Sequence, residues 1–203
     1  MQSIYEQILG DEYSNLHPKL QYRYQIKKDA PFFGEGTMEV VDGGSFLIRQ
    51  VCRLGVKYRL FFSERGEQIP FTIENLVQSD ARGKTIVTWN RTFMFSTTRR
   101  YFDAIMFYEE QEQEIYDYFG VPSIMISTLS FKVINGNMHI APKKQWLKVF
   151  GLKLPLPRFL YGQAEIIESY DDEHDCYRIQ VHVHNSIVGT VFYYKGSFRE
   201  GRN

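Results

Sequence analysis

The chain has 203 residues, of which 43% are hydrophobic and 16% aromatic, enough for one sizeable core. Its 24 basic and 24 acidic residues balance, so no overall charge points to nucleic acid or to an anionic membrane as a partner. Cys52 and Cys176, the two cysteines of the chain, form no disulfide framework and no zinc motif. We therefore expect a single domain over residues 1–203, with no bound metal and no nucleic-acid partner.

The first residues are acidic and polar, where a secretory signal needs a basic start and an apolar run. No stretch approaches the roughly 20 apolar residues that span a bilayer. Two widely separated cysteines also fit a reducing compartment. We predict a soluble, cytoplasmic protein without a transmembrane segment.

Short helices are predicted at the N-terminus. Ser3 can cap a helix that Gly10 ends, and Pro18 suits the first position of a second predicted helix. These helices are too short to form a core of their own. We expect residues 1–30 to form a helical cover on a sheet.

A further helix is predicted at residues 45–54. Leu47, Val51 and Leu54 recur at helical spacing, and Gly55 marks the end. One hypothesis is that this apolar stripe packs against the sheet. The alternative is that it enters a membrane interface. The stripe is short, which favours packing against the sheet.

Alternating apolar and polar residues with turn signals occupy most of the remaining chain, and the sheet is predicted over residues 37–198. Asn135 and Gly136 form the strongest short hairpin signal. No segment after residue 71 is long and helical enough for a parallel crossover. The predicted fold class is therefore mainly β (α+β), with a curved antiparallel meander that forms a barrel or half-barrel. We predict a hairpin over residues 84–108 and strands at 37–41, 71–78, 115–119, 124–134, 137–140, 144–154, 163–170, 177–184 and 190–198.

The hairpin over residues 84–108 carries charged residues where apolar ones are expected. On its first strand, Arg91 shares a face with Trp89 and Phe93. A loop centred on Thr98 would place Asp103 of the return strand diagonally beside Arg91. The sequence therefore predicts a buried arginine and a buried aspartate in contact within an aromatic wall.

Two interpretations of this pair remain open. Arg91 could clamp the carboxylate or phosphate head of an amphipathic ligand, with aromatic side chains around its tail. Alternatively, Arg91 and Asp103 form an internal salt bridge that fixes the strand register, with Glu74 as a second counter-ion. The candidate ligand-binding residues are Glu74, Trp89, Arg91, Phe93, Asp103 and Phe107.

Catalytic and metal-binding patterns are weaker. Glu74 and Asp103 could move protons on a bound molecule if an apolar cavity raised their pKa values. His182 and His184 share a strand face, but no third metal ligand follows at a recognisable spacing. The chain contains no nucleophile-elbow or zinc-protease motif, so no catalytic residue is assigned.

Seven short motifs resemble the bacterial domain-of-unknown-function family 4166. They are LHPKLQ (16–21), GTMEV (36–40), IPFTIEN (69–75), TWNRTF (88–93), FDA (102–104), LKLPLP (152–157) and YYKGSF (193–198). The resemblance covers nearly the whole chain. It implies relatives that occur alone or behind a saccharopine-dehydrogenase-like domain, but it implies no reaction. This chain has no dinucleotide fingerprint between a strand and a helix, so no cofactor is expected.

The leading functional prediction is non-enzymatic binding of an apolar or amphipathic small molecule in an aromatic-lined β cavity. One alternative is a small enzyme that uses buried carboxylates for proton transfer. Another is a protein-interaction module or a homodimer with no small-molecule ligand.

Overall fold

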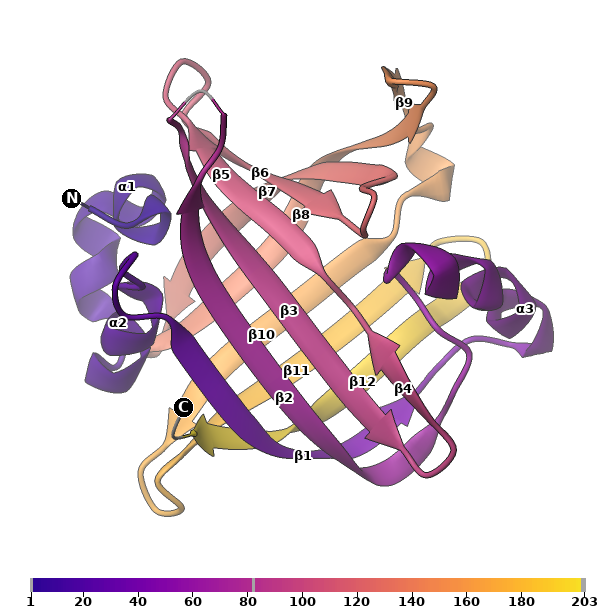
Figure 1. The fold of residues 1–203 in the computed structure, drawn as a ribbon, viewed down its shortest axis with the longest axis horizontal. Helices are drawn as coiled ribbons and strands as arrows, with labels where there is room; N and C mark the ends of the chain where they lie inside the picture. The colour runs from indigo at the N-terminus through magenta and orange to yellow at the C-terminus, as the bar shows by residue number, and fades with distance from the viewer. Residues whose placement is uncertain (1, 82, 202–203) are drawn as a thin grey trace.

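In the part of the chain that the computed structural model describes, residues 2–81 and 83–201, ten antiparallel strands close into a barrel (Figure 1). They are β1 (Phe32–Asp42), β2 (Gly66–Ser79), β3 (Thr85–Phe95), β5 (Ala104–Glu109), β6 (Glu114–Phe119), β7 (Met125–Ile134), β8 (Asn137–Val149), β10 (Gln163–Asp171), β11 (Cys176–Asn185) and β12 (Gly189–Glu200). Two short strands lie outside the ring: β4 (Thr98–Tyr101) pairs with β3, and β9 (Leu152–Pro155) pairs with β8. The sequence also predicts a turn over residues 80–83, in which Arg82 lies outside the described residues.

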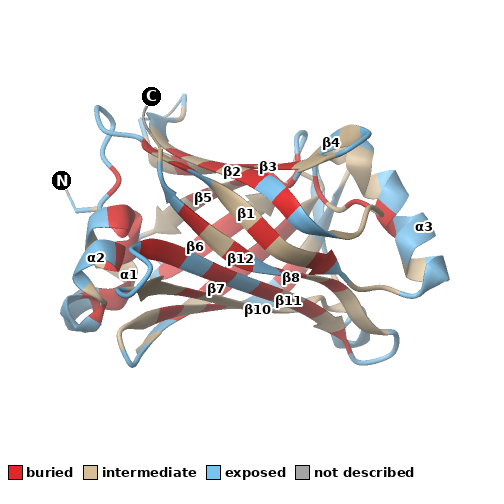
Figure 2. Ribbon diagram, turned by 90° about the horizontal axis from the view of Figure 1, so that it is seen from below, coloured by how far each residue is buried: buried red, intermediate tan, exposed pale blue. Residues whose placement is uncertain are grey.

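The barrel is an up-and-down meander, as predicted from the hairpin signals. Within the ring, strands that follow one another in the chain pair with each other from β1 to β8 and from β10 to β12. The pairing of β1 with β12 joins the first strand to the last. A second join, between β8 and β10, places Ile140 opposite Ile166. Because every strand of the ring has two partners, the alternating residues divide cleanly into an inner and an outer face. Figure 2 shows this division as buried and exposed bands along the strands.

The seam between β1 and β12 depends on two glycines. A Cβ atom on Gly36 would lie 2.1 Å from the carbonyl oxygen of Ser197 and 2.5 Å from the Cα of Phe198. A Cβ atom on Gly196 would lie 2.3 Å from the carbonyl oxygen of Thr37. The two backbones therefore approach more closely than any other residue type allows.

Gly36→Ala should lower the free energy of unfolding by about 3 kcal/mol or more, at the upper end for overpacking, because backbone atoms must move to admit the methyl group. Urea unfolding measures this loss. Gly66→Ala is the matched control, since the nearest atom to its Cβ is the mobile end of the Ile69 side chain, at 3.0 Å. Equal losses in the two variants would show that the seam tolerates a side chain.

The N-terminal helices α1 (Ile4–Leu9), η1 (Gly10–Asn15) and α2 (Pro18–Tyr24) close one end of the barrel (Figure 1). Ser3 caps α1 in a capping box with Glu6, as its sequence position indicates. The side chains of Tyr5 and Tyr24 are fully buried in the same core as the strands. The predicted helices are confirmed, but they are part of the core rather than a cover only.

The helix α3 (Phe46–Gly55) lies at the opposite end of the barrel, followed by η2 (Val56–Tyr58) (Figure 1). Its position confirms the predicted helix, but the orientation of its apolar stripe is contrary to prediction. The side chains of Leu47, Val51 and Leu54 are 73%, 63% and 73% exposed, whereas Cys52 is buried. An amphipathic pattern shows that a helix has an apolar face without showing what covers it. None of the helices in the described residues is long and apolar enough to cross a bilayer.

The hairpin over residues 84–108 has a different register from the predicted one. Phe95 pairs with Thr98, so the turn is centred between residues 96 and 97 rather than on Thr98 as predicted. Farther along, Trp89 pairs with Ala104. A loop centred on Thr98 would place Phe107, not Ala104, opposite Trp89. The observed pairing is therefore shifted by three residues, and a shift by an odd number exchanges the two faces of a strand. The return strand therefore turns Ala104 inward and Phe107 outward.

Candidate functional site

The barrel holds a cavity between its strands, extending toward the end where α3 lies. Its walls are mainly apolar, with Met106, Leu129 and Val181 among them. The cavity volume open to the centre of a water-sized sphere is about 50 Å³. This volume is small beside ligand sites of several hundred Å³, so a long chain would fit only if side chains of the wall move apart.

Five buried polar residues border this cavity, and we call them the interior polar cluster. They are Arg91 on β3, Asp117 on β6, Ser127 on β7, Gln145 on β8 and Glu168 on β10. Three of them form a row across adjacent strands, because Asp117 pairs with Ser127 and Ser127 pairs with Gln145. The cavity thus combines an apolar wall with a few convergent polar groups, as is typical of small-molecule sites.

Arg91 is 4% exposed and contacts no carboxylate within ion-pair distance among the described residues. Its Nε donates to the carbonyl oxygen of Phe102 at 2.8 Å, and its Nη1 donates to the Tyr194 hydroxyl at 3.4 Å. The guanidinium carbon lies 4.2 Å from the centre of the Phe102 ring. Since a buried charge is costly without a charged partner, Arg91 is a candidate to bind an anion in the cavity.

Asp117 is buried, and its burial raises the pKa of its carboxyl to about 8, against the opposing effect of nearby Arg91. This carboxyl is therefore mainly protonated at neutral pH and can donate a hydrogen bond. The Oδ1 atom of Asp117 and the hydroxyl of Ser127 have no hydrogen-bond partner in the described structure. Unpaired buried polar atoms beside a cavity are where a water or a ligand would bind.

The other two members of the cluster are held by the protein itself. Gln145 donates to the carbonyl oxygen of Gly162 at 2.6 Å and accepts from its N–H at 3.0 Å. Glu168 receives two hydrogen bonds from Arg23, with Nε to Oε2 at 2.9 Å. Arg23 also donates to Asn75 at 2.9 Å. These bonds position the site and leave Arg91, Asp117 and Ser127 to meet a ligand.

Sequence reasoning missed the pair of Arg23 and Glu168, although each is 1% exposed. A signal was present for Glu168, because it follows Ala164 and Ile166 on the inward-facing positions of its strand. Arg23 gave none, since an arginine in a short helix is usually solvated. The helix α2 carries it into the core, where its guanidinium carbon lies 4.4 Å from the ring centre of Phe32.

The predicted aromatic wall is present in part. Trp89 and Arg91 border the cavity together, and the Trp89 Nε1 donates to the hydroxyl of Tyr5 at 2.7 Å. Phe93 is fully buried but does not border the cavity. Its ring packs instead against Phe62, with 5.0 Å between ring centres.

The predicted contact of Arg91 with Asp103 is wrong. Asp103 Oδ2 accepts from Arg59 Nη1 at 3.1 Å, and the Asp103 N–H donates to the Arg59 carbonyl oxygen at 3.0 Å. Residues 102 and 103 leave the strand pairing between β4 and β5, which turns this carboxylate toward the segment after α3. Arg91 and Asp103 therefore form no salt bridge that could fix the strand register, whereas the predicted binding of a ligand head by Arg91 does not depend on Asp103.

Phe107 and Glu74 lie on the outer face of the barrel. Phe107 stacks on Tyr116, and Glu74 accepts from Asn90 Nδ2 at 3.0 Å. Glu74 lies between two inward-facing positions of β2, so alternation turns it outward. Neither residue borders the cavity, and the suggested acid pair of Glu74 with Asp103 does not share a site.

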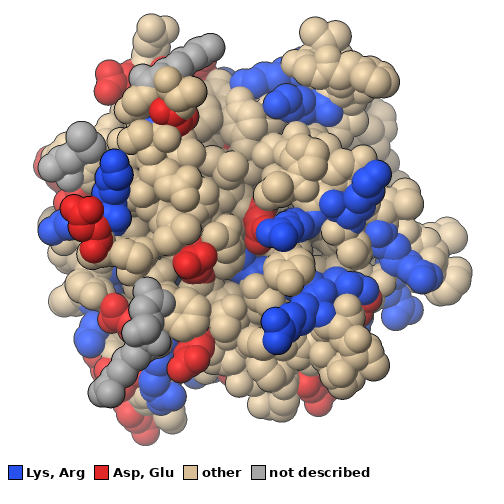
Figure 3. All heavy atoms as spheres, in the orientation of Figure 1, with Lys and Arg blue, Asp and Glu red and all other residues tan. Residues whose placement is uncertain are grey.

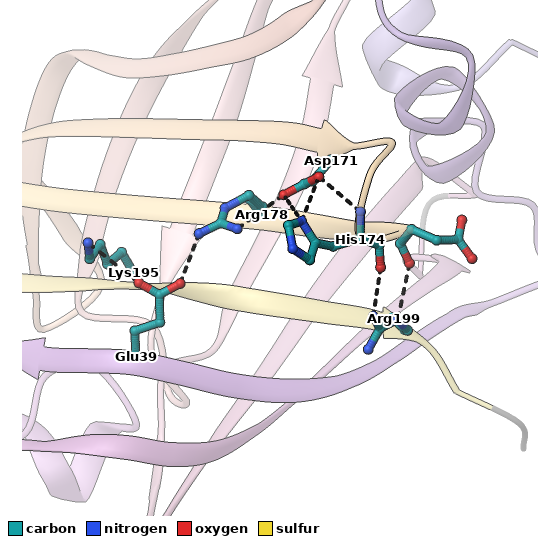
Figure 4. A network of polar contacts seen from close by, with 7 residues as sticks. Glu39, Asp171, His174, Arg178, Lys195 and Arg199 are labelled. Atoms are coloured by element: carbon teal, nitrogen blue, oxygen red, sulfur yellow. Dashed lines mark hydrogen bonds and ion pairs between the residues drawn. The ribbon is translucent and has the colours of Figure 1, made fainter.

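The remaining polar residues of interest are on the outer surface. His182 and His184 have ring centres 6.3 Å apart, and the described residues contain no group of three or more side chains placed to hold a metal ion. A surface network links Arg178 to Asp171 and to Glu39 (Figure 4). These ion pairs are largely exposed, so they contribute little to stability.

The comparisons with known proteins identify the family of the chain but assign it no reaction or ligand. Residues 16–198 match the family described as "Domain of unknown function (DUF4166)". The chain is 48% identical over 204 residues to the uncharacterized protein YndH of Bacillus subtilis (strain 168), a match that covers 98% of each chain. No solved structure matches. The predicted resemblance is thus confirmed, and the chain belongs to the family of domains of unknown function DUF4166.

Proposed function

We propose that the chain is a non-enzymatic intracellular protein that binds a slender amphipathic molecule in the barrel, with the anionic head of the ligand at Arg91. The observation that carries this proposal is the buried guanidinium beside an apolar cavity, with no carboxylate in contact. A carboxylate in the cavity would supply the missing counter-charge.

The apolar part of the ligand would lie against the cavity wall. Leu129, Ile140 and Ile179 line it from three different strands. The small volume favours a single alkyl chain over a bulkier group, and burial of that chain, with movement of the wall, would supply most of the binding free energy. A fatty acid is the simplest molecule with this shape and charge.

The head of the ligand would meet three groups. Arg91 uses its Nε and Nη1 in hydrogen bonds within the protein, which leaves its Nη2 available. The protonated carboxyl of Asp117 and the hydroxyl of Ser127 can each donate to a carboxylate oxygen. A charged acceptor therefore satisfies donors that the protein itself leaves unpaired.

Native mass spectrometry of protein purified without detergent tests this proposal. We expect an added mass that corresponds to an amphipathic carboxylate. A naturally fluorescent straight-chain fatty acid should also bind and be displaced by decanoate. A protein that carries no added mass and does not bind the fluorescent acid would contradict the proposal.

A second candidate function is proton transfer on the bound molecule. It is favoured by Asp117, whose carboxyl pKa of about 8 lies near neutral pH beside the cavity. The co-purified molecule distinguishes the two functions. If the protein only binds that molecule, the molecule is chemically unchanged after incubation. If the protein is an enzyme, the molecule is converted, and the Asp117→Asn variant does not convert it.

A further inference from the structure

The barrel end that carries α3 exposes large apolar side chains from four separate segments. We call Leu47, Val51, Leu54, Phe150, Phe159 and Ile187 the apolar rim; all six are exposed, and Phe150 is fully so. They come from α3, the β8–β9 hairpin, η3 (Arg158–Leu160) and the β11–β12 turn. Figure 1 shows α3 and β9 at the barrel end opposite α1 and α2. Exposed apolar groups gathered in this way mark an interaction surface.

The same end is strongly basic, although the chain as a whole is neutral. Segments 43–63, 119–125, 145–164 and 185–192 contain seven lysines and arginines and no aspartate or glutamate. Arg59 is neutralised by Asp103. The other six are exposed and form no ion pair with a described residue: Arg49, Arg53, Lys57, Lys148, Lys153 and Arg158. Figure 3 shows cations gathered on the side of the molecule where α3 lies, and acids mainly on the other.

The apolar rim lies at the barrel end toward which the cavity extends. Phe61 and Gly162 line the cavity; Phe61 is seven residues after Leu54, and Gly162 is three residues after Phe159. At the opposite end, the buried side chains of the N-terminal helices close the barrel. A molecule that enters the cavity from solvent or from a neighbouring surface therefore passes the rim.

We infer that the α3 end docks on the surface of an anionic phospholipid bilayer. Protruding apolar side chains can enter the interface, while the surrounding cations contact lipid phosphates. A protein partner with a matching surface would need acidic groups around a broad apolar centre. At the other barrel end, the exposed large apolar side chains of the described residues are Tyr22 and Ile134, too few to give a second copy such a centre. The charge pattern and the separate apolar tips fit a lipid surface directly.

Docking in this orientation turns the cavity entrance toward the membrane. An amphipathic molecule could then pass between the bilayer and the barrel without crossing water. This loading step rests on the proposed function, whereas the docking itself does not. The two are therefore tested separately.

Cosedimentation with vesicles tests the docking. The protein should bind vesicles of phosphatidylcholine with phosphatidylglycerol, bind vesicles of phosphatidylcholine alone at least tenfold more weakly, and lose affinity as salt rises. Leu47→Ser with Phe150→Ser should weaken binding at least tenfold, because two apolar contacts are lost. Ile134→Ser, an exposed apolar position at the closed end, is the matched control and should bind as the unchanged protein does.

A charge variant tests the electrostatic part. Arg49→Gln with Arg53→Gln should weaken binding to the anionic vesicles, while Lys27→Gln with Lys28→Gln at the closed end should not. Binding that is absent, or that the rim and control variants change equally, overturns the inference. A dimer that the rim variants convert to a monomer, without vesicle binding, also overturns it and assigns the rim to a second copy. Arg91→Met should still bind vesicles, so a failure of ligand binding remains distinguishable from a failure of docking.

Discussion

Replacement of Arg23 with methionine should lower the free energy of unfolding by about 3 to 5 kcal/mol. Arg23 and Glu168 are each 1% exposed, and two hydrogen bonds join them. Without the guanidinium, Glu168 would be a buried carboxylate with no cation in contact, and Asn75 would lose its donor. Urea unfolding at neutral pH measures the loss.

Two further variants locate the cause of this loss. Arg178→Met removes exposed ion pairs on the outer face (Figure 4) and should cost no more than about 1 kcal/mol. Arg23→Met combined with Glu168→Leu removes both charges and should recover most of the stability, since an apolar pair can replace a buried ion pair. If Arg23→Met and Arg178→Met cost the same, the buried pair does not hold α2 in the barrel.

Asp117→Asn should make the protein more stable at neutral pH. The folded-state pKa of Asp117 is about 8, above the ordinary value near 3.9, because burial disfavours the charged form. Between these two pH values the folded protein holds a proton that the unfolded chain has released, so stability falls as pH rises. At one pKa unit per roughly 1.4 kcal/mol, the wild-type protein should lose up to about 4 kcal/mol between pH 4 and pH 7 from this group.

The difference between Asp117→Asn and the unchanged protein isolates this titration. The difference in unfolding free energy should be near zero at about pH 4 and increase up to about pH 8. Asp29→Asn, at an exposed position, is the matched control and should show no such trend. A constant difference across this range would mean that the Asp117 carboxyl is ionised in the folded protein, and that it cannot donate to a ligand.

The strands were predictable because their alternation is local. Residues 115–119 could have been helical by propensity, yet their alternation indicated a strand, and β6 confirms it. The Asn135–Gly136 turn joins β7 to β8 as its dipeptide indicates. Closure of the barrel was left open between a barrel and a half-barrel, because the pairing of β1 with β12 joins residues from opposite ends of the chain.

The candidate site was only partly predictable, because it depends on register. Arg91 was identified from its own strand, where alternation is sufficient. Its neighbours were not, since an error of three residues in the hairpin exchanged the faces of the return strand. Asp117 was placed on the predicted strand at 115–119, on the same face as Ile115 and Phe119, but the prediction did not say which face points inward. Its position beside Arg91 in the cavity could therefore not be inferred.

The apolar stripe of α3 shows a different limit of structure prediction from sequence. The spacing of Leu47, Val51 and Leu54 predicts the helix correctly, because spacing reflects local backbone geometry. Whether the stripe faces the sheet or something outside the protein depends on how much apolar surface the rest of the core already covers. In this barrel, aromatic side chains such as Phe62 and Phe192 are fully buried while the stripe itself remains exposed.

The proposed ligand site can be followed through Trp89, which borders the cavity beside Arg91. The chain has two tryptophans, and Trp146 can be changed to phenylalanine to leave Trp89 as the single reporter. Arg91→Met in this background should fold, because Arg91 contributes hydrogen bonds but no ion pair to the described structure. Urea unfolding of this variant provides the control for its fold.

Titration of the Trp146→Phe protein with decanoate is the most direct measurement of the central claim. Decanoate should change the emission of Trp89 and saturate, and decylamine, with the same chain and a cationic head, should not. Arg91→Met should weaken decanoate binding roughly tenfold to a hundredfold, the range expected for a hydrogen bond to a charged group. An emission that decanoate leaves unchanged, or an equal affinity in the folded Arg91→Met protein, would contradict a carboxylate site at Arg91.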